Sequence, residues 1–284
     1  MSVSDAELKA LRPDALAPAE IEAKAEAIAV GKATMAPGKM FVLAILAGMF
    51  IAFGATLFSL VQGDGEMWFA VKRVFGAACF SAGLMMVVCC GAELFTGNCL
   101  MVCGWGSKKI GIGGMLKNWV IVYLGNLVGS LLIVLLVYLA NMASMNGGAV
   151  GDAMVATAVG KVTPSALTLF AKGILCNTLV CLAVWMSFSA RTIVDKIVCV
   201  VMPVTAFVAC GFEHSIANMF FLPMGLVAKS AGFGSAVANA AALDITGIFY
   251  NIGIVTLGNI VGGAILVGLA YWYVYHKKPE KKKK

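Results

Sequence analysis

The sequence contains few charged residues. Only 12% of its 284 residues are charged, about half the share in an average soluble domain, whereas 61% are hydrophobic and the mean hydropathy is +0.94. A soluble globule cannot hide that much apolar surface. The composition therefore excludes disorder, collagen and a disulfide-linked secreted domain, and it indicates an integral membrane protein.

Several functional motifs are also missing. None of the seven prolines follows an asparagine, so the paired Asn-Pro-Ala motifs of a neutral-solute aquaporin are absent. All nine cysteines fall in apolar segments, where free thiols behave as small hydrophobes, and no Cys/His spacing resembles a zinc site. There is no serine nucleophile motif either. We therefore expect no metal site, no cofactor, no nucleic-acid partner and no enzymatic activity.

Long apolar runs predict the membrane segments. The runs lie at residues 40–61, 74–103, 118–143, 173–190, 197–228 and 245–275. About 20 apolar residues suffice to cross a bilayer as a helix. The sequence thus predicts an all-α integral membrane protein with six transmembrane helices at 39–275. This domain lies between an N-terminal segment, 1–38, and a basic tail, 276–284.

The distribution of positive charge predicts the orientation. Most of the 21 Lys and Arg residues lie in the N-terminal segment, the tail and the two loops on their side of the membrane. Such an excess marks the cytoplasmic face, so both termini are expected inside. The N-terminal segment is too acidic for a cleavable signal peptide. Pro18 predicts the start of a short amphipathic helix that ends near Val30 and lies on the membrane face.

Two motifs occur twice, in the same order. Residues 90–98 and 210–218 share the pattern Cys-Gly-x-Glu-x-x-x-x-Asn, and residues 124–130 resemble 257–263, with Leu-Gly-Asn followed by an aliphatic residue, Val and Gly. The halves, about 40–143 and 164–275, thus form an internal repeat. Each half has three segments, so the second half enters the membrane from the opposite face.

The inverted repeat predicts a transport site near the middle of the bilayer. The runs at 74–103 and 197–228 are longer than a membrane span requires, and each has a polar, Gly-containing patch near its middle. We therefore expect the second and fifth helices to be broken. The backbone amides freed at the start of a half-helix attract anions. An anion path between the two broken helices is the physical inference.

Ionisable residues at membrane depth are candidates for this path. His214 can hold or release a proton, or donate a hydrogen bond while neutral. For the repeat-equivalent Glu93 and Glu213 we expect capping of freed amides, with direct contact to substrate as the alternative. Lys161 would draw anions into an outer vestibule, although a solvated loop lysine is equally compatible with the sequence. Short polar groups suited to bridging a site are Thr96, Asn98 and Asn218.

Three motifs together resemble the formate/nitrite transporter family. They are the Cys-Gly-Ala-Glu-Leu-Phe-Thr-Gly-Asn run at 90–98, the Gly-Ile-Leu-Cys-Asn run at 173–177 with the apolar stretch at 179–186, and the Gly-Phe-Glu-His-Ser-Ile-Ala-Asn-Met run at 211–219. The similarity covers roughly residues 20–275. It implies an aquaporin-like protomer in a homopentamer, with one anion pore per protomer, in a bacterial cytoplasmic (inner) membrane.

The resemblance also implies roles for individual residues. His214 matches the family's central histidine, Thr96 its loop threonine, and Lys161 its conserved lysine before the fourth helix. Asn177 would lie near the site in that helix. The hydrophobic constrictions would be formed by Phe80, Leu94 and Phe207.

The expected function is passage of a small monovalent weak-acid anion. Formate is the favoured substrate and nitrite the next, while hydrosulfide and lactate are handled by relatives. The anion passes either as the neutral acid, after proton transfer from or through His214, or as an anion hydrogen-bonded to His214 and Thr96. The rival class, a membrane-embedded enzyme, lacks a catalytic constellation.

Overall fold

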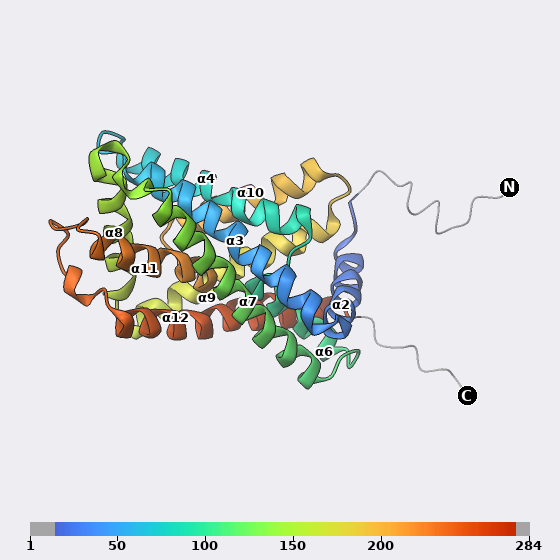
Figure 1. The fold of residues 1–284 in the computed structure, drawn as a ribbon. Coiled ribbons are helices and arrows are strands. Elements are labelled where there is room, and N and C mark those ends of the chain that lie inside the picture. The colour runs from blue at the N-terminus through green and yellow to red at the C-terminus, as the bar shows by residue number, and fades with distance from the viewer. Residues whose placement is uncertain (1–14, 277–284) are drawn as a thin grey trace, which may run out of the picture.

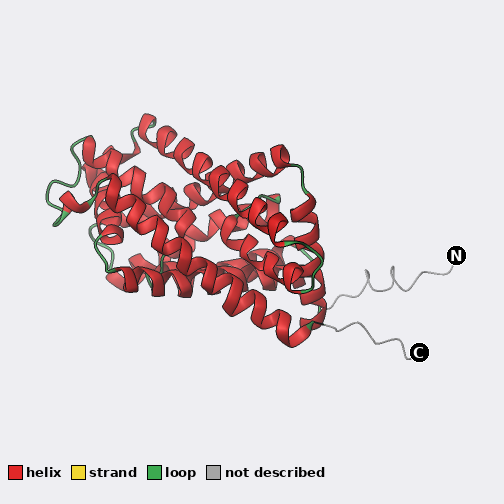
Figure 2. Ribbon diagram, turned by 90° about the horizontal axis from the view of Figure 1, so that it is seen from below, coloured by secondary structure: helices red, strands yellow, loops and turns green. Residues whose placement is uncertain are grey.

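The chain folds into a bundle of helices. The computed structural model describes residues 15–276, and within that range it contains helices and loops but no strand (Figure 2). Most of the expected basic tail lies outside the described residues, as does the first part of the N-terminal segment. The main helices are α2 (Pro18–Thr34), α3 (Pro37–Gln62), α4 (Phe69–Cys90), α7 (Ile112–Leu139), α8 (Ala149–Val162), α9 (Ala166–Ser189), α10 (Ile193–Ala209), α11 (Ser215–Ser230) and α12 (Ile245–Ile260).

Shorter elements complete the chain. A short helical stretch follows α4 and is made of α5 (Phe95–Asn98), η1 (Cys99–Met101) and α6 (Val102–Gly106). After α12 the helix continues as a π-helical stretch, η5 (Val261–Leu269), and ends as α13 (Ala270–Tyr275). Single 3₁₀ turns in the loops are η2 (Met142–Ser144), η3 (Asn146–Gly148) and η4 (Ala240–Ala242).

Among residues 15–276, five helices are long and apolar enough to cross a membrane. They are α3, α4, α7, α9 and the continuous stretch Ile245–Tyr275. Their outward faces are apolar: α7, for example, leaves Leu116, Val120 and Leu124 exposed. Helices α10 and α11, with 17 and 16 residues, are each shorter than a span. The segment expected at 197–228 is therefore divided between two shorter helices.

Both interruptions lie at the polar patches that the sequence analysis singled out. Helix α4 ends at Gly91 and the chain becomes helical again at Phe95, while α10 ends before Gly211 and α11 begins at Ser215. Gly91 and Gly211 have φ values of 78° and 71°. Glycine adopts this left-handed conformation without the steric cost that a side chain brings, so it ends a helix readily.

The bundle has two different ends. Helices α2 and α6 lie at one end, and α8 lies at the other (Figure 1). Helix α3 packs between α4 and α7, and α9 between α10 and α12, so the two halves are built from equivalent contacts. Helix α8 is not among the predicted elements. It places Lys161 near its C-terminal end, where the sequence analysis allowed a loop.

Candidate functional site

One asparagine fastens each interrupted helix to its neighbours. Asn126, on α7, accepts a hydrogen bond from the Phe95 amide (3.0 Å) and donates to the carbonyls of Ala44 and Glu93 (2.8 and 2.9 Å). Its side chain is fully buried. Because α5 begins at Phe95, Asn126 caps the new helix and at the same time ties it to α3.

Asn259, on α12, makes the same three contacts in the second half. It accepts from the Ser215 amide (2.9 Å) and donates to the carbonyls of Gly173 and Glu213 (2.8 and 2.9 Å). Both asparagines belong to the Leu-Gly-Asn motifs of the sequence repeat. The asparagines of these motifs therefore stabilise the interruption in each of the two helices.

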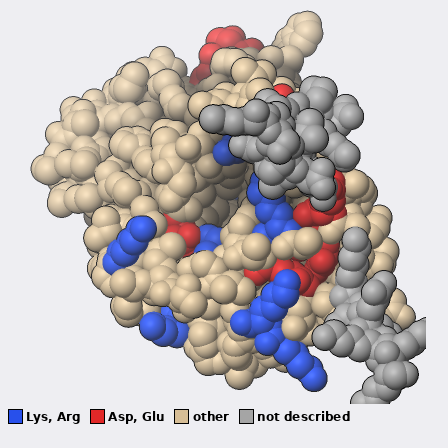
Figure 3. Space-filling model, turned by 90° about the vertical axis from the view of Figure 1, so that its right-hand side faces the viewer, with Lys and Arg blue, Asp and Glu red and all other residues tan. Residues whose placement is uncertain are grey.

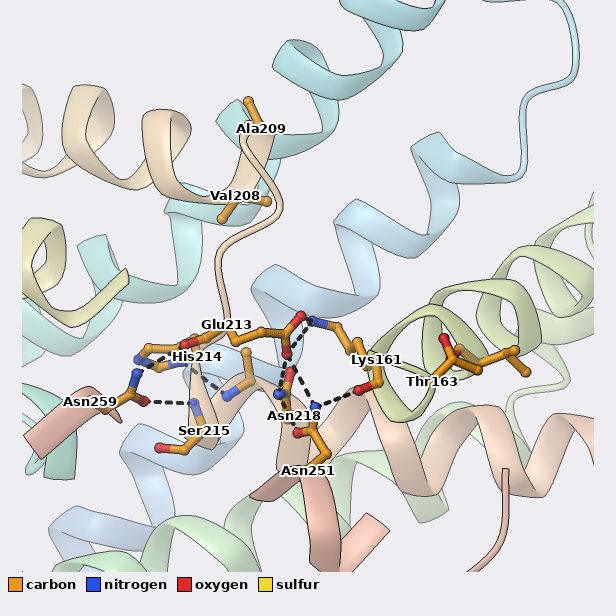
Figure 4. A network of polar contacts seen from close by, with 12 residues as sticks. Lys161, Thr163, Val208, Ala209, Glu213, His214, Ser215, Asn218, Asn251 and Asn259 are labelled. Atoms are coloured by element: carbon orange, nitrogen blue, oxygen red, sulfur yellow. Dashed lines mark hydrogen bonds and ion pairs between the residues drawn. The ribbon is translucent and has the colours of Figure 1, made fainter. Parts of the chain in front are cut away.

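A charged network surrounds Glu213 at the α8 end (Figure 4). Lys161 Nζ lies 3.2 Å from both carboxylate oxygens. Asn218 donates to Oε2 at 2.6 Å and to Asn251 Oδ1 at 2.7 Å, and Asn251 Nδ2 donates to the Lys161 carbonyl at 2.7 Å. Glu213 is 3% exposed, so Lys161 is needed to offset the cost of burying its negative charge.

The same network occurs around Glu93 at the α2 end. Lys32 Nζ lies 2.5 Å from Oε1. Asn98 donates to Glu93 Oε2 at 2.7 Å and to Asn118 Oδ1 at 2.8 Å, and Asn118 Nδ2 donates to the Lys32 carbonyl at 3.5 Å. Helix α2 thus supplies the counterpart of Lys161.

The sequence analysis missed Lys32, Asn118 and Asn251. Glu93 N and Glu213 N donate to the carbonyls of Leu43 and Lys172, and each network lysine lies eleven residues before that carbonyl. This spacing makes Lys32 the counterpart of Lys161, but it becomes visible only once the structure shows which carbonyls the two glutamate amides contact.

The expected role of the two glutamates needs correction. Their carboxylates accept from lysine and asparagine side chains rather than from freed backbone amides. Neutral acceptors cap the half-helices instead: Asn126 at Phe95, Asn259 at Ser215, and His214 at Ala217. The carboxylates can therefore pair with the lysines, and this pairing offsets the cost of burying each charge.

His214 and Thr96 form a buried polar pair between the halves. His214 Nε2 lies 2.9 Å from Thr96 Oγ1, and the side chains are 3% and 0% exposed. His214 Nδ1 accepts the Ala217 amide hydrogen at 3.0 Å. Since Nδ1 is an acceptor, a neutral imidazole carries its hydrogen on Nε2 and donates it to Thr96.

Aromatic and aliphatic side chains enclose this pair. Phe80 and Phe207 meet edge to face with centroids 6.0 Å apart, and the Phe207 ring lies 5.9 Å from the His214 ring. Leu94 occupies the position in the first motif that His214 occupies in the second. All three apolar side chains are at most 2% exposed.

Two cavities approach the pair from opposite ends. The Lys161 cavity, about 450 Å³, is lined by Phe80, Phe207, His214 and Lys161, together with Arg73 and Lys172. The Lys32 cavity, about 500 Å³, is lined by Leu94, Gly97, Asn98 and Lys32, together with Lys24 and Lys196. Thr96 lies between a residue of each cavity: it contacts His214, which lines the first, and it precedes Gly97, which lines the second. Each cavity contains several cations and one buried carboxylate, which favours anions.

The remaining predicted residue also lies at this centre. Asn177 is fully buried on α9 and donates to the carbonyls of Thr96 (3.2 Å) and Asn259 (2.7 Å). It holds the backbone of α5 against α9 and α12. The structure thus brings every predicted site residue into one continuous region, from Lys161 through the central pair to Glu93.

Known proteins share this sequence and fold. The sequence pattern of the formate/nitrite transporter family matches residues 19–273. The formate channel FocA of Escherichia coli K12 is 45% identical, over 94% of this chain and 98% of its own, and FocA of Haemophilus influenzae is 39% identical, over 92% and 95%. Both relatives are channels rather than enzymes.

Solved structures agree. A pentameric formate channel with formate bound superposes with a TM-score of 0.74 at 37% identity, covering 85% of this chain and 98% of that one. An ion channel of the same family superposes at 0.79 with 31% identity, over 92% and 99%. With its membrane-spanning helices, its two cationic cavities and these relatives, this multi-pass membrane protein belongs to the formate/nitrite transporter family.

Proposed function

We propose that this protein is a channel for small monovalent weak-acid anions and that formate is its substrate. The observation that carries the proposal is the buried His214–Thr96 pair between two cationic cavities. The named relatives support formate in particular. The size of the central polar pair suits an anion of a few atoms better than a large metabolite.

The proposed architecture has six membrane crossings in two inverted repeats. Helices α10 and α11 together make the fifth crossing. The matched contacts of Asn126 and Asn259 support the repeat, and the matched lysines extend it to include α2 and α8. We place the α2 end in the cytoplasm of a bacterial inner membrane, following the excess of Lys and Arg there. Assembly as a homopentamer follows the relative described as pentameric.

The two lysines act as the entrances in this proposal. Lys161 and Lys32 are 14% and 21% exposed in their side chains, so each ammonium group is accessible from its cavity while paired with a glutamate. An anion arriving in either cavity gains attraction from the lysine and its cationic neighbours. Beyond the lysines, the apolar side chains Phe80, Phe207 and Leu94 make a full charge costly.

Two versions of the mechanism avoid the cost of moving a full charge past these apolar side chains, and both use His214. In the first version, the His214 imidazole passes a proton from the water of the entrance cavity to a carboxylate oxygen of formate, which crosses as neutral formic acid and releases the proton to water at the far side. In the second version, the anion crosses while His214 Nε2–H and the Thr96 hydroxyl donate hydrogen bonds to it. The bond from Ala217 N–H to Nδ1 favours a neutral histidine that acts as a donor, because a second ring proton would break that bond.

Uptake into proteoliposomes tests the proposal. Purified protein is reconstituted, and formate uptake is recorded together with internal pH. We expect His214→Phe to abolish uptake of formate and its proton. His214→Asn keeps a donor that does not titrate, so proton-linked uptake that survives in this variant excludes a relay through the imidazole. Thr178→Val, on α9 beside Asn177, is a matched control for reconstitution. Uptake by His214→Phe equal to wild type would overturn the role of His214.

The same assay compares substrates. Nitrite and hydrosulfide are the alternatives within the family, and each is a small monovalent anion of a weak acid. Faster uptake of either at equal concentration would reassign the substrate and leave the pore unchanged. No uptake of any of the three anions would contradict the channel function itself.

A further inference from the structure

A second cluster of titratable side chains lies outside the permeation path, at the α2 end. Glu22 and Glu26 are one turn apart on α2, and they are only 2% and 3% exposed. His276, which follows α13, meets them from the other end of the chain. One potential ligand atom from each of the three residues lies within 4.8 Å of the others. Figure 3 faces this end of the molecule, where acidic and basic side chains lie close together.

Glu26 is fully engaged in this cluster. Its Oε1 contacts His276 Nδ1 at 2.9 Å and accepts the Ser107 hydroxyl hydrogen, and its Oε2 lies 2.5 Å from Lys109 Nζ. Trp272 Nε1 donates to Ser107 Oγ at 2.8 Å. Ser107 and Trp272 therefore hold Glu26 and the imidazole in place.

Glu22 is not satisfied in the same way. Its Oε1 is buried and has no hydrogen-bond partner among the described residues. A buried carboxylate oxygen without a partner costs free energy and requires an explanation. Glu22 belongs to a cluster in which Glu26 and His276 have partners, so one acceptor atom of this cluster is left without a donor.

The charge of the cluster leads to the same conclusion. Two buried carboxylates face one ammonium group, Lys109, whose side chain is 50% exposed. Two ionised carboxylates would carry more negative charge than this single ammonium group balances.

We propose that Glu22, Glu26 and His276 form a binding site for one divalent transition-metal cation of the Zn²⁺ or Co²⁺ class. Two carboxylates and an imidazole are ligands that such ions prefer, whereas Mg²⁺ and Ca²⁺ prefer oxygen ligands alone. Ser107 supplies the outer support that orients such ligands. A shared proton between the two glutamates is the rival occupant, and the titration below distinguishes it from a metal ion.

The site would connect two distant parts of the chain. Its ligands come from α2 and from the residue after α13, which α2 contacts directly. Lys32 lies further along α2, so the metal would also steady the helix that presents this lysine to its cavity. The metal would compete with Lys109 for Glu26, and the exposed lysine side chain is free to turn toward water.

Metal titration of the full-length chain tests the site. The protein is purified in detergent without a histidine tag, treated with a chelator, and titrated with Co²⁺ while visible absorption is recorded. We expect saturation at one equivalent per chain, displacement by Zn²⁺, and a rise in Tm with bound Zn²⁺, because a ligand that binds only the folded state stabilises it. Absence of saturable binding would overturn the proposal.

Variants separate this site from others. Glu22→Gln and His276→Gln should each weaken Co²⁺ binding by about tenfold or more, the order seen even for outer-shell changes, and Lys109→Met should strengthen it. Glu66→Gln, in the exposed loop after α3, is the matched control. Cys90→Ser with Cys210→Ser tests the exposed thiols. Binding that survives in the first two variants, or that disappears only with the thiols, would overturn the site. If the wild type binds no metal and Glu22→Gln raises Tm, Glu22 and Glu26 share a proton instead of a metal ion.

Discussion

The two interrupted helices share a frame but differ at the centre of the molecule. Both are held by an asparagine with three contacts and flanked by a Glu–Lys–Asn network. At the first residue before each half-helix, however, one has Leu94 and the other has His214. Two residues later, the first has Thr96 and the second has Ile216. The central polar pair therefore takes one member from each half.

This difference separates the features that both halves share from the polar pair that occurs only once. The frame is duplicated because both breaks pose the same problem of freed backbone groups and a buried charge. The pair is not duplicated, because a polar residue at all four positions would line the whole centre with donors. Leu94 stands at the position equivalent to His214, and Ile216 at the position equivalent to Thr96. The centre therefore keeps one polar pair in apolar surroundings. The predictions that follow test this contrast, starting from the largest expected effect.

Removing the asymmetry should have the largest effect. His214→Leu makes the two half-helices alike at this position, and we expect formate uptake into proteoliposomes to fall by about 100-fold, because a hydrogen bond to a charged group is worth up to about 3 kcal/mol. Leu94→Met, which keeps an apolar side chain, serves as the control and should stay near wild type. An equal loss in both variants would show that packing, rather than the donor, matters here.

The two frame asparagines should be equivalent. Asn126→Ala and Asn259→Ala each leave a buried amide and carbonyls without a partner, which costs about 1–3 kcal/mol for a group that loses its bond. We expect each variant to lower the stability in detergent by about 3 kcal/mol, followed by tryptophan fluorescence during thermal unfolding. A clear inequality between the two variants would argue against matched roles. Ser235→Ala, at an exposed position in the loop after α11, is the control.

The two ion pairs should differ in strength. Glu213→Gln leaves the more buried lysine, Lys161, without a counter-charge, and we expect a loss of about 2 kcal/mol. Glu93→Gln affects Lys32, which is more exposed and better solvated, so we expect a loss of about 1 kcal/mol. Thermal unfolding of the two variants side by side measures the difference. The reverse order would mean that α2 is held more tightly than α8.

The smallest effect should come from the loop between α3 and α4. Asp64 Oδ1 accepts the amide hydrogens of Glu66 and Met67, at 2.7 and 2.9 Å, and these bonds hold its pKa below the usual 3.8. A depressed pKa means that its contribution to stability is present above pH 3.8 and is lost as the pH falls below it. Asp64→Ala should therefore show a slightly lower Tm at pH 7, and its difference from wild type should shrink as the pH falls below 3.8. A difference that grows at low pH would contradict this assignment.

Some of the architecture was predictable without coordinates. Apolar length predicted six membrane segments, and five of them correspond to helices long and apolar enough to cross a membrane within the described residues. The repeated motifs predicted interruptions near residues 91 and 211, where the structure has breaks at Gly91 and Gly211. The resemblance identified His214 and Thr96, and the structure places them 2.9 Å apart. The roles of the pore residues stay predictions until transport is measured.

Other features were outside the reach of sequence reasoning. Glu93 and Glu213 were expected at backbone amides, but they pair with lysines instead, and the pairing of Glu93 with Lys32 was not predicted because the helix that begins at Pro18 was expected only to lie on the membrane face. The spacing in the sequence excluded a Cys/His zinc site, yet the fold brings Glu22, Glu26 and His276 together across 250 residues. Sequence alone determined what repeats and what must be buried, because periodicity and hydropathy are local. The partners of the buried charges were decided only by the tertiary structure, because a charge removed from water must be matched by whichever chain segment packs against it.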